Sequence, residues 1–400
     1  MLTKLKTLGP GLLYAGAAIG VSHLVQSTKA GAIYGYTLII AIVLAHFFKY
    51  PFFILGPRYA ASTGKSLVEG FASLGKWATG VLLLVTLGTM FAVQAAVTIV
   101  TAGLIQKMFA THINVVIISG ILLALSFGIL QLGKLKFLDK LMKVTIILLA
   151  ISTLVAFGVS WGVRASTISY IPKFHFGNPT DLAFLIAFIG WMPAPLDLTV
   201  WHSIWSAGTT QNRASSDFDF KVGFYGTAVL GVCFLTLGAH TLYSSGIDLQ
   251  SSAGGFASQL IDVFTTNLGE WSYWFILIAA VTAMFSTTLT CFDAMPRVMS
   301  QISNELNISA TVRKVAFWRI VLVGGSMVIL VFLAGSMKQM VNFATSISFL
   351  TAPIIALMCY KLHLEKSELN LWSTNEKRLA IIGIVALTVF SSVYIYSLLS

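Results

Sequence analysis

Apolar residues along this chain come in runs of about 20, separated by short polar segments. A run of that length crosses the hydrocarbon core of a bilayer as an α-helix. The pattern therefore predicts an all-α polytopic membrane protein with eleven spans. The predicted spans are Pro10–Ile33, Tyr36–Gly56, Trp77–Leu104, Ile113–Leu132, Leu141–Trp161, Leu182–Ile204, Val222–Leu242, Tyr273–Cys291, Val315–Ala334, Met340–Cys359 and Leu379–Leu399.

Two of these spans carry residues that interrupt a helix. The first contains "AGAAIGVSHLVQSTKAGAIYGY", with Gly16 and Gly20 followed by a polar stretch; the sixth contains "AFIGWMPAPLDLTVWHSIW", with Pro193 and Pro195. Proline removes a backbone donor and clashes with the preceding turn, and glycine weakens a helix. Bare backbone at membrane depth persists only where it is buried in protein or lines a wet cavity. Both spans are therefore expected to break beside a cavity.

The two broken spans are the first and the sixth, so equivalent positions recur after five helices. That spacing is typical of transporters built from an inverted five-helix repeat, whose substrate site lies where the broken helices meet. We expect one transmembrane domain over residues 1–400. Repeat one would cover residues 10–161, repeat two residues 182–360, and an extra helix residues 379–399.

Composition and charge agree with a membrane protein. Hydrophobic residues make up 57% of the chain and charged residues only 10%, with a mean hydropathy of +0.87. The net charge is +11, but the basic residues lie singly in loops, so nucleic acid is not an expected partner. The expected partners are membrane lipid and a small ion or molecule; the pattern does not predict an oligomeric state. Three cysteines (Cys233, Cys291 and Cys359) fall inside spans and resemble ordinary buried apolar residues.

The distribution of lysine and arginine predicts the orientation, because cytoplasmic loops of membrane proteins are enriched in these residues. Of the 25 lysines and arginines, Lys29 and Lys49 lie inside spans and Lys107, Arg164, Lys173 and Lys338 lie on one side. The other nineteen, from Lys4 and Lys6 to Arg378, lie on the opposite side. We expect a cytoplasmic N-terminus, an external C-terminus and residence in the inner (plasma) membrane.

Several polar residues inside the broken spans are candidate site residues. Asp197 follows the prolines of the sixth span. Burying a charged carboxylate at membrane depth costs free energy, so an acid there suggests a role in substrate binding or proton transfer. The alternative is a structural ion pair with Lys29 or Lys49. His23 belongs either to the site or to helix–helix hydrogen bonding, and Lys29 either acts in coupling or extends to the interface. Further candidates for the substrate site are Gly20, Ser22, Gln26, Met192 and Pro193.

Two acids near the start of the seventh span have a simpler interpretation. Asp217 and Asp219 precede its apolar part. We expect them to be solvated residues that cap this helix.

The sequence resembles the Nramp family of proton-coupled divalent-metal transporters. The resemblance rests on "GPGLLYAGAAIGVSHLVQSTKAGAIYGYTL" in the first span, "ASTGKSLVE" after the second and "LDKLMKV" entering the fifth. It appears over the whole chain and implies a LeuT-like fold, alternating access and a site between the first and sixth helices.

The metal-binding motifs of that family are altered here. Its Asp-Pro-Gly-Asn corresponds to Gly20, Val21, Ser22 and His23, so the ligand aspartate is glycine and the ligand asparagine is histidine. Its Met-Pro-His keeps Met192 and Pro193 but has alanine third; a shifted alignment would place Asp197 at the histidine position instead. The acids that the family places in the third helix are absent from this span, which offers Gln94.

These substitutions leave two substrate classes open. Met192 and His23, with backbone carbonyls, suit a softer metal ion, and Asp197, His23, Lys29 and Gln94 are the coupling candidates. Alternatively, His23 and Lys29 make the cavity less anionic and suit an amino acid or another small organic or anionic solute. A third hypothesis is a receptor or partner subunit that keeps the fold but does not transport.

On family grounds we expect a secondary-active transporter of a metal cation, with alternating access and a coupled proton. We expect no enzymatic activity, because no serine–histidine–acid, paired-aspartate or zinc-ligand pattern has helix-compatible spacing. No cofactor is expected; the metal ion would be the substrate.

Overall fold

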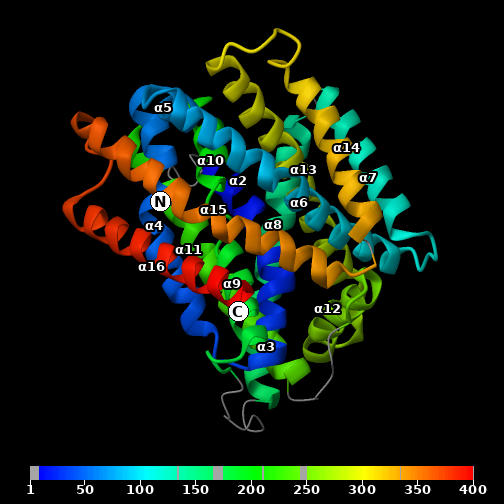
Figure 1. Ribbon diagram of the computed structural model, residues 1–400. Helices are drawn as coiled ribbons and strands as arrows, with labels where there is room; N and C mark the ends of the chain where they lie inside the picture. The colour runs from blue at the N-terminus through cyan, green and yellow to red at the C-terminus, as the bar shows by residue number, and fades with distance from the viewer. Residues whose placement is uncertain are drawn as a thin grey trace.

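The computed structural model describes residues 9–132, 135–164, 174–209, 211–243, 250–333 and 335–399, and these residues form helices joined by short connections. Figure 1 shows the helices gathered into one bundle, with α5 at one end and α3 at the other. Seven helices in this part of the chain are each long and apolar enough to cross a membrane. The other four predicted spans correspond to α7, α8 and two interrupted helices.

The first half of the chain follows the predicted order. The first span is divided into α2 (Pro10–Ala18), the π-helical turn η1 (Val21–Ser27) and α3 (Thr28–Tyr34). The following helices are α4 (Ile39–Thr63), the short α5 (Leu67–Ser73), α6 (Lys76–Met108), α7 (Val115–Gln131) and α8 (Leu135–Arg164).

The second half begins with the other divided span, α9 (Pro179–Trp191) and α10 (Leu198–Ala207). It continues through α11 (Arg213–Gly238) with η2 (Ala239–Tyr243), then α12 (Ala253–Leu268), η3 (Glu270–Ser272), α13 (Tyr273–Glu305), α14 (Val315–Leu333), α15 (Met337–Glu365), η4 (Ser367–Leu369) and α16 (Thr374–Leu399).

Several helices extend beyond the predicted spans. The eighth span was predicted to end at Cys291, whereas α13 continues to Glu305, because a helix can extend past the apolar layer once polar partners are available. Asp293 and Arg297 form one such pair at 2.8 Å, and Arg319 of α14 lies 3.5 Å from the same aspartate. Ala334, the predicted end of the ninth span, lies outside the described residues, as do Lys4, Lys6, Lys134 and Lys173 of the orientation argument.

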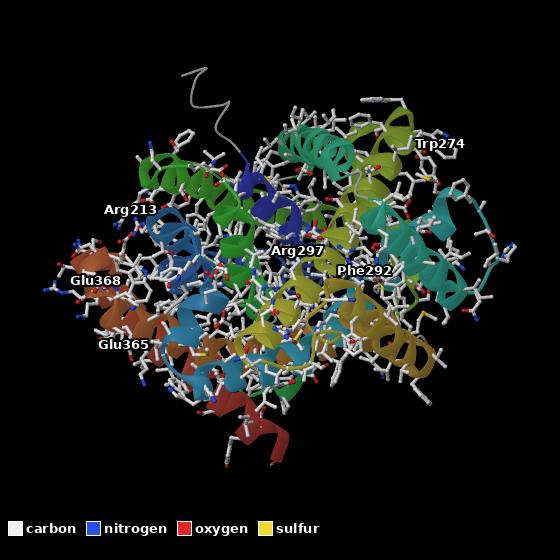
Figure 2. All side chains as sticks on the ribbon, turned by 90° about the horizontal axis from the view of Figure 1, so that it is seen from above. Arg213, Trp274, Phe292, Arg297, Glu365 and Glu368 are labelled. Carbon is white, nitrogen blue, oxygen red and sulfur yellow. The ribbon has the colours of Figure 1, made fainter. Side chains whose placement is uncertain are left out.

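The interior of the bundle is formed by the two divided spans together with α6, α11, α13 and α15. α2 packs on α11 and α13, α9 packs on α15, and α6 packs along α13. Figure 2 shows the contrast along α13: Trp274 lies at the edge of the bundle and Phe292 lies inside. Trp274 is 59% exposed and Phe292 is fully buried. The broken segments are therefore enclosed by protein.

The expectation that Asp217 and Asp219 are solvated was wrong. Asp217 pairs with Arg58 of α4 at 2.8 Å, and Arg58 also contacts Glu376 of α16 at 2.9 Å. Asp219 is buried, and its carboxylate accepts hydrogen bonds from the backbone N–H groups of Gly9 and Gly11. These N–H groups at the start of α2 have no partner within their own helix. Asp219 thus caps the first helix from α11.

Candidate functional site

The first break lies between α2 and η1, at Ile19 and Gly20. Gly20 has φ −129° and ψ −125°, which is not helical. A Cβ atom built on Gly20 would lie only 2.6 Å from Oγ1 of Thr287 on α13. Thr287 in turn donates a hydrogen bond to the carbonyl of Gly16 at 3.1 Å. Glycine is required here because α13 passes directly against the backbone of the break.

The second break runs from Met192 to Asp197, between α9 and α10. The ammonium of Lys49, from α4, donates to the carbonyl oxygens of Ile189 at 2.7 Å, Gly190 at 3.0 Å and Ala194 at 3.4 Å. Lys49 is fully buried. The last carbonyls of a helix lack partners of their own and carry partial negative charge. The side chain of Lys49 therefore supplies hydrogen-bond donors to the free carbonyls at the end of α9.

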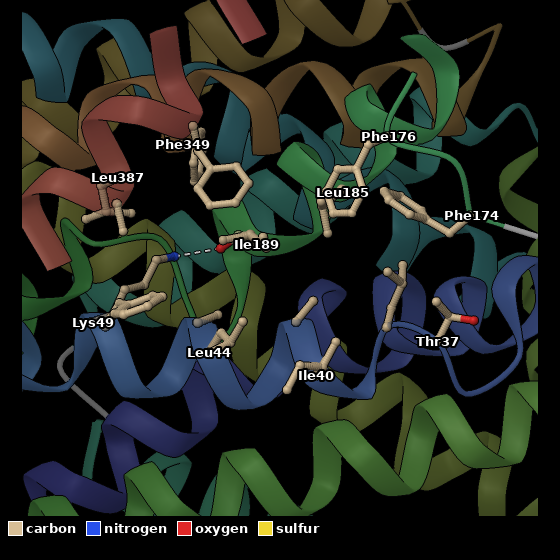
Figure 3. Close-up of a pocket in the computed structure, with 16 residues that line it drawn as sticks. Thr37, Ile40, Leu44, Lys49, Phe174, Phe176, Leu185, Ile189, Phe349 and Leu387 are labelled. Carbon is tan, nitrogen blue, oxygen red and sulfur yellow. Dashed lines mark hydrogen bonds between the residues drawn. The ribbon is translucent and has the colours of Figure 1, made fainter. Parts of the chain in front are cut away.

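An apolar pocket of about 180 Å³ lies beside this lysine, between α4, α9, α15 and α16. Figure 3 shows Lys49 at one end of the pocket, with its ammonium directed to Ile189, and Phe174, Phe176 and Leu185 toward the other end. Ile40 and Leu44 on its wall are exposed on the outside of the bundle. The walls are almost entirely apolar, so this pocket suits lipid chains better than a polar substrate.

A much smaller cavity lies between the two breaks. Its volume is about 20 Å³, which is room for one or two water-sized particles. The first span, α6, the sixth span and α13 all contribute to its walls, which include Ala18, Ser22, Trp191, Pro195, Thr287 and Cys291. The cavity has the size of a single ion and is too small for an amino acid in this conformation, and most of its other wall residues are apolar.

Asp197 occupies the N-cap position of α10 and is only 8% exposed. Its Oδ1 atom has no hydrogen-bond partner among the described residues. Lys49 and Cys291 are close enough to interact with the carboxylate electrostatically, yet neither Lys49 nor Lys29 forms an ion pair with it in the described chain. The structural pair considered from sequence is therefore not formed as a direct contact. The backbone N–H groups at the start of α10 and the side chain of Thr89 lie close to the carboxylate, while its Oδ1 atom has no hydrogen-bond partner in the described chain.

His23 is fully buried, and both of its ring nitrogens have partners. Nδ1 lies 2.7 Å from the Ser22 hydroxyl and 3.0 Å from the carbonyl oxygen of Ala18. Nε2 lies 2.9 Å from the carbonyl oxygen of Thr227 on α11. The Thr227 hydroxyl lies 3.3 Å from Nε2 of a second buried histidine, His46 of α4. In this conformation His23 links the break to α11 and has no nitrogen free for a metal.

The chain was compared with known proteins. The family model described as "Natural resistance-associated macrophage protein-like", Nramp, matches residues 11–400. The chain belongs to the Nramp family. An uncharacterized protein of Pasteurella multocida is 32% identical over 98% of this chain and 92% of its own length.

Solved structures show the same fold at low identity. A manganese transporter of Eremococcus coleocola superposes with a TM-score of 0.74 at 14% identity, covering 99% of this chain and 87% of that one. MhsT, in complex with L-phenylalanine, gives 0.68 at 12% identity, covering 96% and 98%. Mhp1, of the nucleobase-cation-symport-1 family, gives 0.63 at 13% identity, covering 98% and 92%. The fold is the LeuT-type transporter fold, and this Nramp protein is a multi-pass membrane transporter and not an enzyme.

The Nramp motif positions can now be placed in the structure. Gly20, which replaces the family's ligand aspartate, lies against Thr287, so a side chain at this position would meet that threonine. Met192 is fully buried in a cluster with Ile42 and Phe188, and its sulfur lies beside Gly231 of α11. Gly231 is one helical turn from Thr227, the partner of His23. Met192 and His23 therefore meet neighbouring turns of α11, and neither belongs to the walls given above for the central cavity.

Four further predicted residues, Pro193, Gln94, Gln26 and Lys29, do not line that cavity. Pro193 lies within the second break. Gln94 of α6 donates to Oγ1 of Thr98 at 3.1 Å and to the carbonyl of Thr288 at 3.3 Å. Gln26 and Lys29 lie further along the first span and line a separate small cavity. Groups of three or more histidine, cysteine, aspartate or glutamate side chains arranged for a metal ion do not occur in the described part of the chain.

Sequence reasoning missed Lys49, Thr227, Thr287 and Cys291 as site residues. Lys49 offered one signal, since a lysine in the middle of an apolar span requires a buried partner. Cys291 was taken as ordinary packing, but it lines the central cavity. The threonines carried no signal, because only the packing of α11 and α13 brings them to the breaks.

Proposed function

We propose that this Nramp protein carries a metal cation through the gap between its two broken helices by alternating access. The observation that carries the proposal is the ion-sized cavity between the breaks. Cys291 on its wall is close enough to the buried carboxylate of Asp197 to interact with it electrostatically, and Oδ1 of that carboxylate has no hydrogen-bond partner in the described chain. The manganese transporter that shares the fold supports a metal as the substrate class. The cavity size argues against the alternative, an amino acid or another organic solute.

The cation would contact groups that surround the breaks. Ser22 offers a hydroxyl oxygen and Cys291 a sulfur, and Asp197 is the acid available to balance the charge. A sulfur ligand with few carboxylates favours borderline or soft metal ions over Mg²⁺ and Ca²⁺. Met192 and His23 would join the coordination only after a rearrangement that frees the histidine from Ala18 or Thr227.

We further propose that Asp197 and the His23–Thr227–His46 network take part in proton coupling. Asp197 is a buried acid within electrostatic reach of Cys291 on the cavity wall. Thr227 contacts both histidines, His23 through its backbone carbonyl and His46 through its hydroxyl. Lys29 and Gln94 are the other coupling candidates. The proposed location is the inner (plasma) membrane with a cytoplasmic N-terminus, supported by the distribution of lysine and arginine.

The test is uptake of Mn²⁺ by proteoliposomes, together with calorimetric titration of the purified protein. We expect saturable binding and uptake in the wild type and a loss of at least about tenfold in Asp197→Asn, since a charged partner contributes more than about 1.4 kcal/mol. Asp262→Asn, which changes an exposed acid on α12, is the matched control and should behave as wild type.

Two further results would decide the substrate class. Met192→Ala should weaken Mn²⁺ binding if the sulfur joins the coordination during transport. Absence of Mn²⁺ binding, together with saturable uptake of an amino acid, would overturn the proposal and favour the organic-solute alternative. Binding without uptake would indicate a receptor.

A further inference from the structure

A second cavity lies along the first span, one turn beyond His23 and away from α2. Val25, Gln26 and Lys29 form one wall, Gln250 and Phe256 a second, and the start of α15 the third, with Met337, Lys338 and Val341. Figure 1 shows α3 and α12 toward the end of the bundle opposite α5, and the cavity lies between them. Its volume is about 10 Å³, near the room that one water-sized particle requires.

The side chain of Gln26 has no partner here. It is fully buried, and neither its Nε2 nor its Oε1 atom forms a hydrogen bond in the described chain. A buried amide without partners costs free energy, so such groups in folded proteins usually meet a ligand or an ordered water. The amide of Gln26 therefore indicates that the cavity holds an occupant.

Lys29 lines the same cavity, one turn from Gln26, and is only 5% exposed. Its ammonium lies 3.5 Å from Oδ1 of Asn342 and 5.1 Å from the ring centroid of Phe184. It forms no ion pair with a carboxylate in the part of the chain that the structure describes. An ammonium buried without an anionic partner is strongly unfavourable. Such a lysine loses its proton unless a neighbouring group compensates its charge, and an anionic occupant of the cavity would keep it protonated.

We propose that this cavity binds a small monovalent anion, of the size and charge of chloride, between Gln26 and Lys29. Nε2 of Gln26 and the ammonium of Lys29 would donate to it, and Lys338 adds a second positive charge. A cavity of this size holds at most a single-atom ion, and chloride, which is somewhat larger than water, would require a small outward movement of its walls. Lys338 is exposed, so its side chain can move to admit the ion, whereas burial holds Gln26 and Lys29 in place. The residues that line this cavity differ from those of the central cavity, although Lys29 is also a coupling candidate in the proposed transport.

The experiment measures thermal unfolding of the full-length protein in lipid nanodiscs while chloride replaces gluconate at constant ionic strength. A ligand that binds the folded state raises the unfolding temperature in a saturable manner. We expect this response to chloride and to bromide, but not to gluconate. Lys29→Met should weaken the apparent chloride affinity at least about tenfold, because it removes a charged donor. Lys107→Met, a like change on α6 outside the cavity, should respond as wild type.

Gln26→Glu distinguishes anion binding from a purely structural role. A carboxylate at this position supplies a tethered anion next to Lys29. The variant should unfold at a higher temperature than wild type in gluconate and should no longer respond to chloride. Gln26→Leu supplies neither a hydrogen-bond donor nor a charge. This variant should lose the chloride response and should not unfold at a higher temperature than wild type in gluconate.

Either of two outcomes would overturn the proposal. One is equal stabilisation by chloride and gluconate, which would mean that the cavity holds only water. The other is an unchanged chloride response in Lys29→Met and Gln26→Leu. Mn²⁺ binding by the same variants is measured separately, so a failure here is distinguishable from a failure of the proposed transport function.

Discussion

The ammonium of Lys49 lies 2.7 Å from the carbonyl oxygen of Ile189, at the end of the helix that leads into the second break. It also contacts the carbonyl oxygens of Gly190 and Ala194. Proteins of this fold use free carbonyls at half-helix ends to hold cations. In this chain, the side chain of Lys49 on α4 donates to those carbonyls, so the end of α9 has hydrogen-bond partners without a bound ion.

Replacement of Lys49 by methionine is expected to destabilise the protein. Methionine matches the length of the aliphatic chain but donates no hydrogen bond, and each buried group left without a partner costs about 1–3 kcal/mol. The unfolding temperature in nanodiscs should fall and Mn²⁺ uptake should be lost. Lys65→Met, at an exposed position after α4, is the control. A Lys49→Met protein with normal stability and uptake would show that the carbonyl contacts are dispensable.

Substitutions at Gly20 and Thr287 are expected to have effects on stability that depend on each other. Gly20→Asp restores the acid that metal-transporting relatives carry, but its Cβ would meet Oγ1, Cγ2 and Cβ of Thr287 at 2.6, 2.7 and 3.0 Å. The single variant should be destabilised by about 1–3 kcal/mol through overpacking. Thr287→Ala removes two of these three atoms.

The double variant Gly20→Asp with Thr287→Ala should therefore recover stability and bind Mn²⁺ more tightly than Thr287→Ala alone. Calorimetric titration and thermal unfolding of the wild type, the two single variants and the double variant form a double-mutant cycle. Equal Mn²⁺ affinity in the double variant and Thr287→Ala would mean that an acid at position 20 does not reach the ion.

Loss of the Asp219 carboxylate should loosen the start of α2. This carboxylate accepts the N–H of Gly11 at 2.8 Å and of Gly9 at 3.1 Å, and capping groups of this kind contribute about 0.5–2 kcal/mol. Asp219→Ala should lower the unfolding temperature and increase hydrogen exchange at the first turn of α2. Asp262→Ala serves as the control. Exchange that stays at the wild-type rate would contradict the capping role.

Cys291 provides a probe of access to the central cavity. It lines that cavity, whereas Cys233 and Cys359 are buried at other positions. In a background with Cys233→Ser and Cys359→Ser, a small thiol reagent should modify Cys291 when the transporter opens, and should then block Mn²⁺ uptake. Bound Mn²⁺ should slow the modification. Rapid modification that leaves uptake intact would place Cys291 away from the path.

Much of the architecture could be predicted from the sequence. The apolar runs predicted the spans, and the glycines of the first span and the prolines of the sixth predicted where helices are interrupted. These features act locally: a 20-residue apolar stretch has few alternatives to a membrane helix, and proline disrupts a helix within one turn. The first-span stretch, together with "ASTGKSLVE" and "LDKLMKV", also predicted the Nramp family, which the comparisons confirmed.

Only the tertiary structure decided which side chains meet at the breaks. Lys49, Thr227, Thr287 and Asp219 lie far in sequence from their partners, and their roles depend on how α4, α11 and α13 pack against the divided helices. Asp217 and Asp219 show most clearly what the sequence alone does not predict. The two acids lie near the same helix start, but one pairs with an arginine of α4 and the other accepts backbone N–H groups of α2. Hydrophobicity determines which segments enter the membrane, but contacts between segments determine which polar groups are paired and which remain available to bind an ion.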